Sequence, residues 1–141
     1  MEVKLEKLKV KYQGKSLVID LNKELSIDEA LLSSQLRTIP SNYYVLCSLR
    51  DKYIKKRDEL SREKDIAYSN AWVYYKDSNE RLNNDYVSNK ANTNHKYVSI
   101  YKRYIKAVNK ANKFIALCKA YESRENILRT LSANLRKQPL T

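Results

Sequence analysis

Few residues of this 141-residue chain could take part in covalent or acid–base chemistry. His95 is the single histidine, and Cys47 and Cys118 are the two cysteines. A zinc site needs ligands at recognisable spacings, and the chain has neither a C-x-x-C motif nor a histidine cluster. Gly14 stands alone, which excludes the glycine-rich phosphate loops of nucleotide-binding enzymes. The sequence therefore predicts a binding protein and not an enzyme, with no metal and no cofactor.

The histidine, the cysteines and the neighbouring carboxylates are expected to have structural roles and not catalytic ones. His95 is expected to cap a helix or to lie at the surface, and both cysteines are expected to be small core residues. Neighbouring carboxylates, such as Asp58 and Glu59, lie in a mixed-charge segment and are expected to form surface ion pairs. The two cysteines, the absence of a signal peptide and the absence of an apolar run of about 20 residues predict a cytoplasmic protein without a membrane span.

Positive charge is concentrated in the last third of the chain. The whole chain has 28 Lys and Arg residues against 16 Asp and Glu residues, a formal net charge of +12. Residues 1–25 contribute six basic and four acidic side chains, and residues 26–95 contribute eleven and ten. Residues 96–141 contribute eleven basic and only two acidic side chains. This last segment is therefore the candidate anion-binding part.

A basic stripe follows one side of the helix that is expected over residues 95–136. At 100° per residue, its cations fall within an arc of about 120°, and no acidic residue lies between Lys96 and Lys119. Such a stripe can bind a phosphate backbone, because each neutralised phosphate releases counterions. The alternative is a solvated lysine face, and we favour nucleic acid. The stripe comprises Lys96, Lys102, Arg103, Lys106, Lys110 and Lys113.

The same predicted helix has a wide apolar face. This face covers about 200°, which is more than one antiparallel partner helix can bury. Self-association is the simplest way to cover the excess, so a homo-oligomer is expected. The predicted interface residues are Tyr101, Tyr104, Ile105, Val108, Phe114, Ile115 and Tyr121.

An aromatic cluster closes the preceding long helix, at Tyr68, Trp72, Tyr74 and Tyr75. Single-strand-binding proteins stack bases on such side chains beside a positive groove. Spacings of three and four residues are also typical of core packing, and we favour packing for most of the cluster. Tyr68 or Trp72 is the expected exception, and both join the candidate nucleic-acid-binding residues.

A small β-hairpin is expected at the N-terminal end. Apolar and charged residues nearly alternate on both sides of Gly14, which is the pattern of two short strands joined by a glycine turn. We therefore assign residues 1–25 to a β-hairpin, with an irregular extension as the alternative.

The rest of the chain, residues 26–141, is predicted to form one helical domain. Ser26 and Glu29 form a capping box that starts a helix. Pro40 should end this helix, because proline disfavours α geometry in the residue before it. The predicted fold class is mainly α, a long antiparallel helical hairpin with short accessory helices. The helices are expected at about residues 27–38, 42–75, 80–92 and 95–136.

Several segments, in this order and spacing, resemble the UvsY family, the recombination mediator proteins of T-even-like bacteriophages. Residues 23–28, Lys-Glu-Leu-Ser-Ile-Asp, are similar to the family's K-D-V-x-I-D, and Tyr74-Tyr75 is similar to the pair that closes its long helix. Leu117-Cys118 and residues 120–124 are similar to an F-C followed by A-x-x-S-R. Residues 127–129 resemble the family's terminal I-K pattern. The resemblance covers most of the chain and leaves out the predicted β-hairpin.

This resemblance implies a function and partners. The family binds single-stranded DNA and helps a RecA-like recombinase to displace a single-stranded-DNA-binding protein and form a filament, and its members assemble as rings. The family's K-x-R before the Tyr-Tyr pair corresponds here to Ser69 and Ala71, which are uncharged. Lys64, Lys76 or the basic stripe would have to replace those cations.

Two other interpretations remain open. One is a helical coiled-coil adaptor whose lysines only solvate the surface, and the other is a general binder of RNA or duplex nucleic acid. Tighter binding of single strands than of duplex, with an affinity that falls steeply as salt rises, would separate the mediator from the adaptor.

Overall fold

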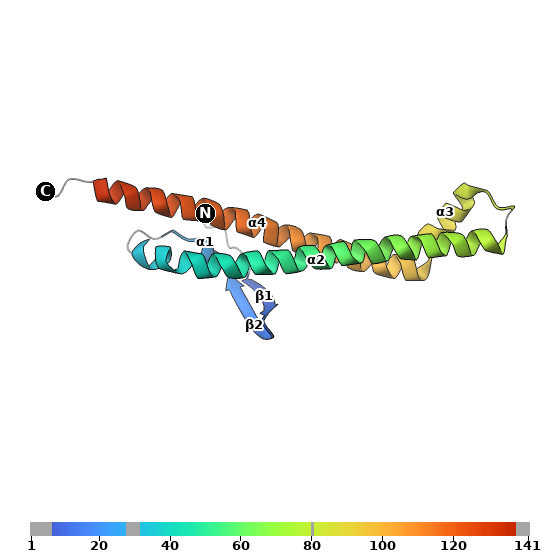
Figure 1. The fold of residues 1–141 in the computed structure, drawn as a ribbon, viewed down its shortest axis with the longest axis horizontal. Helices are drawn as coiled ribbons and strands as arrows, with labels where there is room; N and C mark the ends of the chain where they lie inside the picture. Colours follow the sequence, from blue (N-terminus) through green and yellow to red (C-terminus); the bar gives the residue numbers. More distant parts are fainter. Residues whose placement is uncertain (1–6, 28–31, 80, 138–141) are drawn as a thin grey trace. The chain divides into compact units, whose positions relative to one another are not determined.

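The computed structural model describes residues 7–27, 32–79 and 81–137 (Figure 1). The chain is mainly helical, with a two-stranded antiparallel hairpin near its N-terminal end, as the sequence predicts. Over these residues, none of the helices combines the length and low polarity that spanning a lipid bilayer requires.

The described residues form two compact units. The first unit comprises residues 7–50 and 114–137, and the second unit comprises residues 51–113. Helix α2 (Leu32–Ser78) and helix α4 (His95–Lys137) each have one length, or segment, in each unit. Residues 32–50 of α2 and 114–137 of α4 belong to the first unit, and residues 51–78 of α2 and 95–113 of α4 belong to the second.

The hairpin consists of strands β1 (Lys7–Tyr12) and β2 (Lys15–Asp20). Tyr12 pairs with Lys15, so the turn has two residues, Gln13 and Gly14, with φ of 49° and 76°. Two positive φ angles are the geometry of a type I′ turn, and glycine adopts this conformation without strain. The single glycine is therefore placed where the hairpin needs it.

One face of the hairpin belongs to the core of the first unit. Val10 and Ile19 are buried, and Leu8 and Leu17, their cross-strand neighbours on the same face, are half-buried. Side chains alternate along a strand, so the lysines between them point to solvent. This alternation is the sequence pattern from which the hairpin is predicted.

A short helix that the sequence does not predict follows the hairpin directly. It is α1 (Leu21–Leu25), whose N-cap residue Asp20 accepts a hydrogen bond from the Asn22 N–H at 3.2 Å. Aspartate is a favoured N-cap residue because its carboxylate satisfies an otherwise free N–H.

The predicted start of a helix at Ser26 is wrong for the residues that the structure describes. Ser26 is the C-cap of α1, and its hydroxyl donates to the Lys23 carbonyl at 2.9 Å. Its own carbonyl accepts from Arg124 Nε at 2.9 Å, an interaction with a residue far along the chain that no local pattern contains. Asp28 and Glu29, the other half of the predicted capping box, lie outside the described residues.

The predicted break at Pro40 is also wrong, because α2 runs without interruption from Leu32 to Ser78. A proline inside a helix removes one backbone hydrogen bond and costs about 3 kcal/mol. Leu46 and Leu49 on the same helix are 3% and 1% exposed. Burial of two leucines stabilises the helix by an amount comparable to this cost, so the segments predicted at 27–38 and 42–75 join into one.

Two asparagines set the starts of the last two helices. Helix α3 (Asn84–Asn92) begins after Asn83, whose side chain accepts from the Tyr86 N–H at 2.8 Å. Helix α4 begins after Asn94, whose side chain accepts from the Tyr97 N–H at 3.1 Å. These caps place α3 later than the helix predicted from residue 80 and agree with the helix predicted over 95–136.

The core of the first unit is made where α2 and α4 pair antiparallel. The Tyr43 ring stacks on the Tyr121 ring at 6.0 Å, and the Tyr43 hydroxyl donates to the Glu122 carboxylate. This hydrogen bond raises the pKa of Tyr43 well above its usual value. The α4 residues buried in this unit are Phe114, Leu117, Cys118, Tyr121, Arg124 and Leu128.

Candidate nucleic-acid interface

The α4 length of the second unit has an exposed cationic surface. Lys102, Arg103, Lys106 and Lys110 are all exposed, and the α4 residues from 95 to 113 contain no carboxylate. Within the described part of the chain, no ion pair engages Lys102, Arg103 or Lys106. Their charge therefore reaches solvent without local compensation, as a polyanion-binding surface requires.

Three of these cations border a groove between the α2 and α4 lengths of the second unit. The groove has a volume of about 340 Å³. Its floor is apolar and consists of Tyr53, Leu60 and Ala107. Its rim is cationic and consists of Lys56, Arg103, Lys106 and Lys110.

Lys110 also covers the floor of this groove. Its Nζ lies 4.6 Å from the centroid of the Tyr53 ring, a cation–π contact. Lysine carries its charge on a flexible four-carbon stem, so Nζ can leave the ring and meet an anion at the rim.

The aromatic cluster lies on a different side of the second unit. The Tyr68 ring meets the Tyr97 ring edge-on at 5.4 Å, and Tyr97 and Tyr101 have centroids 5.9 Å apart. At 100° per residue, the α4 tyrosines lie about 150° around the helix from the cations of the groove. The structure therefore separates these aromatic residues from the groove cations, whereas Lys64, on the same helix as Tyr68, lies 5.0 Å from the Tyr104 ring centroid.

Lys64 and Lys76, two candidate DNA-binding residues, are already engaged within the chain. Lys64 Nζ lies 2.8 Å from the Asp65 carboxylate, which raises the pKa of Lys64, and 5.0 Å from the Tyr104 ring centroid. Lys76 Nζ donates to the Leu82 carbonyl at 2.7 Å and holds the turn after α2. Both lysines therefore offer less free charge than the exposed α4 cations.

Tyr68, Trp72 and Tyr75 pack within the fold, as the core interpretation predicts, whereas Tyr74 is 67% exposed. The Trp72 indole N–H donates to Ser88 Oγ at 3.3 Å, which ties α3 to α2. The Tyr75 hydroxyl accepts from the Asn94 side-chain amide at 3.3 Å. Both rings are half-buried, as is Tyr68. The predicted stacking role of Tyr68 and Trp72 therefore competes with the contacts that these rings make in the fold.

The predicted oligomer interface divides into two groups. Tyr101 and Ile105 are 42% and 40% exposed, and Tyr104, Val108 and Ile115 are half-buried. Phe114 and Tyr121 are 1% and 0% exposed, so their assignment to an intermolecular surface is wrong. Tyr121 stacks on Tyr43 of α2, so the partner helix of the same chain covers this part of the apolar face.

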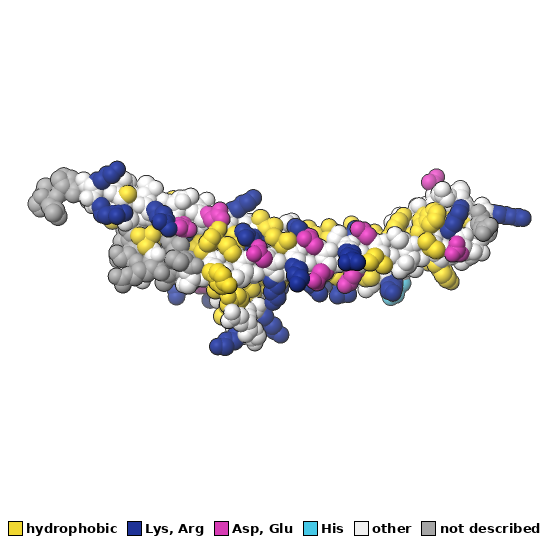
Figure 2. All heavy atoms as spheres, viewed as in Figure 1, with side chains coloured by type: hydrophobic (Ala, Val, Ile, Leu, Met, Phe, Trp, Pro, Cys, Tyr) yellow, Lys and Arg dark blue, Asp and Glu magenta, His cyan; other side chains and the backbone are white. Residues whose placement is uncertain are grey.

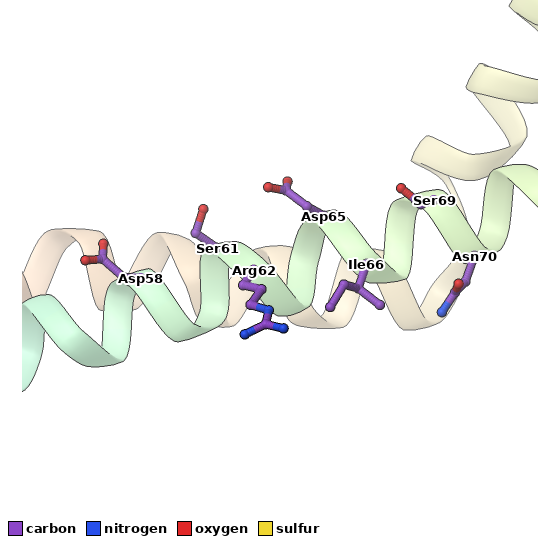
Figure 3. A pocket seen from close by; sticks show the side chains of 7 residues that line it. All are labelled: Asp58, Ser61, Arg62, Asp65, Ile66, Ser69 and Asn70. Atoms are coloured by element: carbon purple, nitrogen blue, oxygen red, sulfur yellow. The ribbon is translucent and has the colours of Figure 1, made fainter.

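The outer face of α2 in the second unit carries both acidic and basic side chains. Asp58 and Asp65 pair with the adjacent Arg57 and Lys64, and Figure 2 shows acidic and basic side chains interspersed over α2. A shallow depression there is lined by one helix alone (Figure 3). In that view, Asp58, Ser61, Asp65 and Ser69 project to one side of the helix and Arg62, Ile66 and Asn70 to the other, so the polar side chains do not converge. The lining residues are Asp58, Ser61, Arg62, Asp65, Ile66, Ser69 and Asn70.

Cys118, Cys47 and His95, the residues with the most reactive side chains, occupy core or surface positions in the fold. Cys118 is buried, and this burial raises the pKa of its thiol to about 11. Cys47 is half-buried, and neither cysteine forms a disulfide. His95 is the exposed first residue of α4. Among the described residues, no three His, Cys, Asp or Glu side chains converge to hold a metal ion.

The sequence alone does not predict the floor of the groove, because the contacts that set the pairing of α2 with α4 come from the structure. Tyr53 and Leu60 are seven residues apart on the apolar stripe of α2, and Lys56 lies between them. In an antiparallel pair, residue numbers at contacting positions have a nearly constant sum, as Tyr68 with Tyr97 and Tyr53 with Lys110 demonstrate. Applying this sum to Lys56 points to Ala107 and thus to the groove.

Comparisons of this chain with protein-family models, with curated proteins and with solved structures found no match.

Proposed function

We propose that this protein binds single-stranded DNA through the exposed cationic length of α4 in its second unit. The observation that carries the proposal is the set of exposed cations at Lys102, Arg103, Lys106 and Lys110, with no carboxylate between residues 96 and 113. Each phosphate that these cations neutralise releases counterions, which supplies sequence-independent affinity.

We further propose a role as a recombination mediator that loads a RecA-like recombinase onto DNA covered by a single-stranded-DNA-binding protein. The resemblance to the UvsY family supports this role. In a homo-oligomer, several basic surfaces would hold one strand, and each later contact would form intramolecularly. Tyr101 and Ile105 support self-association, because both are large, apolar and substantially exposed.

The alternative is a helical adaptor that binds proteins, and one observation favours it. Ile66 and Val73 are 50% and 51% exposed and lie seven residues apart on the outer side of α2. Apolar side chains at this spacing form a stripe typical of helix–helix docking. A protein partner on this stripe would leave the α4 cations free, so the two functions predict different effects of charge reversal.

The experiment is a titration of a fluorescent 15-nucleotide oligothymidylate, as a single strand and annealed to its complement, at two salt concentrations. Reversing Arg103, Lys106 and Lys110 to Glu should weaken single-strand binding on the order of 100-fold. The slope of log K against log salt should fall by about 2, because three phosphate contacts are lost.

A matched control reverses Lys119, Arg136 and Lys137 to Glu. This variant has the same net charge and carries its changes on the same helix, in the first unit. Weak losses in the control and strong losses in the groove variant are expected. Equal losses in both variants would contradict a localised site, and no binding by the wild-type protein at low salt would favour the adaptor.

A further inference from the structure

We infer that the groove between α2 and α4 is a nucleobase subsite. It would hold one unstacked base of a bound strand on its apolar floor, while the rim cations would contact the phosphates on either side. The inference rests on the proposed single-strand binding and adds the contact by which the protein would distinguish a single strand from a duplex.

The floor of the groove has the properties that a flat heterocycle needs. Tyr53 contributes an aromatic ring, Leu60 is 3% exposed, and Ala107 has a side chain short enough to leave the space open. The volume of about 340 Å³ lies at the lower end of small-molecule sites. A phosphate alone would leave this apolar floor in water.

The rim has the charge that a nucleotide strand complements. None of the groove's lining residues carries a carboxylate, and four of them are cations. Arg103 and Lys110 are about 10 Å apart along the α4 axis, at 1.5 Å per residue, so the rim extends beyond one phosphate. An uncharged apolar ligand would leave these cations unused, whereas a strand satisfies both the floor and the rim.

When a strand binds, Lys110 would exchange its contact with the Tyr53 ring for a contact with a phosphate. In the free protein, Nζ lies over the Tyr53 ring at 4.6 Å and is attracted by its π-electrons. A phosphate at the rim attracts the Lys110 ammonium group more strongly, and departure of Lys110 exposes to a base the part of the ring that it covers. Lys52 Nζ, 5.6 Å from the same ring centroid, is not a lining residue of the groove. Phosphate contact and base contact would therefore reinforce each other.

A base within a duplex is stacked and paired, so it cannot enter the groove unless it is first unstacked. A single strand presents its bases without that cost. Phosphate contacts alone tolerate either form, so the groove is the part of the interface that would favour single strands.

The test compares two labelled 15-mers of equal charge, oligothymidylate and an abasic strand of tetrahydrofuran nucleotides. The wild-type protein should bind the oligothymidylate on the order of tenfold tighter. The ratio of the two affinities should change little with salt, although both affinities fall, because stacking does not release counterions.

Two variants locate the effect in the groove. Ala107→Phe should fill the groove and lower the oligothymidylate affinity to that of the abasic strand, with abasic binding unchanged. Tyr53→Leu, which removes the ring and keeps an apolar side chain, should lose most of the same difference. The matched control is Asn109→Phe, which adds the same ring at an exposed α4 position outside the groove and should preserve the ratio. Circular dichroism checks that each variant is folded.

The outcomes separate this inference from the proposed function. If wild-type protein binds both strands equally, the groove is not a base subsite, although DNA binding stands. If it binds neither strand, the proposed function itself fails. If neither variant changes DNA binding but Ala107→Phe abolishes binding of an acidic, phenylalanine-containing peptide, the groove is a peptide site and the inference is overturned.

Discussion

The two lengths of α4 belong to one continuous helix and have opposite environments. In the first unit, Phe114, Cys118 and Tyr121 are at most 1% exposed. In the second unit, Ala111 is the one buried residue among the described α4 positions from 95 to 113, and the cations from Lys96 to Lys113 are exposed. The first-unit part of α4 therefore contributes mainly to the core, and the second-unit part presents an exposed cationic surface.

This difference shows what apolar residues on a helix do and do not imply. Both lengths carry apolar residues three and four positions apart, so periodicity alone does not distinguish them. The first unit adds Val10 and Ile19 of the hairpin to its core. The second unit has Tyr101 and Ile105 left exposed beside a row of lysines.

The largest expected effect is a loss of stability when a buried residue of the first-unit part of α4 is shortened. Leu128 is fully buried, so Leu128→Ala should lower the free energy of unfolding by about 2–5 kcal/mol through lost burial and a residual cavity. Its counterpart Ile105→Ala removes a side chain that is 40% exposed and should cost less than about 1 kcal/mol. Urea denaturation of both variants measures the contrast. Equal losses would mean that the two lengths of α4 are packed alike.

The next largest effect is a loss of stability at high pH that comes from the buried Cys118 thiol of the first unit. Burial raises the pKa of Cys118 from 9.0 to about 11, so the folded protein retains a proton that the unfolded chain loses. The stabilising contribution is complete below pH 9 and is lost as the pH rises from 9 to 11, by up to about 3 kcal/mol.

Thermal melting across this pH range in wild-type protein and in Cys118→Ala measures that contribution. The difference in stability between the two proteins should shrink as the pH rises, since alanine has no proton to retain. A difference that is constant from pH 8 to pH 11 would show that the Cys118 thiol is not held in a buried environment.

The smallest expected effect concerns Trp72, the only tryptophan. Its indole N–H is bonded to Ser88, and it lies about 18 Å along α2 from Leu60 on the groove floor. Saturation with oligothymidylate should therefore leave its emission maximum unchanged, whereas Ser88→Ala should shift it slightly. Strong quenching by DNA would place the strand on the aromatic cluster and remove the distinction between that cluster and the groove.

Much of the fold is local and could be predicted from the sequence. The turn at Gly14, the caps near residues 83 and 94 and the long helices depend on residues close together in the chain. The helix through Pro40 and the role of Ser26 could not be predicted, because each depends on distant partners. Arg124, whose guanidinium binds the Ser26 carbonyl across the first unit, is the clearest example.

The candidate site could be predicted only in part. The exposed cations of α4 followed from charge spacing and the absence of acids. The groove required knowing which α2 residues face Ala107, and the separation of the aromatic cluster from the cations required knowing which side of α4 each group occupies. Such pairings arise from tertiary packing, which residue spacing on one helix does not determine.

Lysine acetylation footprinting, with and without a saturating single-stranded oligonucleotide, tests the central claim most directly. Each modified lysine is quantified by mass spectrometry, so the two lengths of α4 are compared within one molecule. Bound DNA should protect Lys102, Lys106 and Lys110 and leave Lys119 and Lys137 as reactive as before. Protection of the hairpin lysines Lys7, Lys9 and Lys15, with the second-unit α4 lysines unchanged, would contradict this claim.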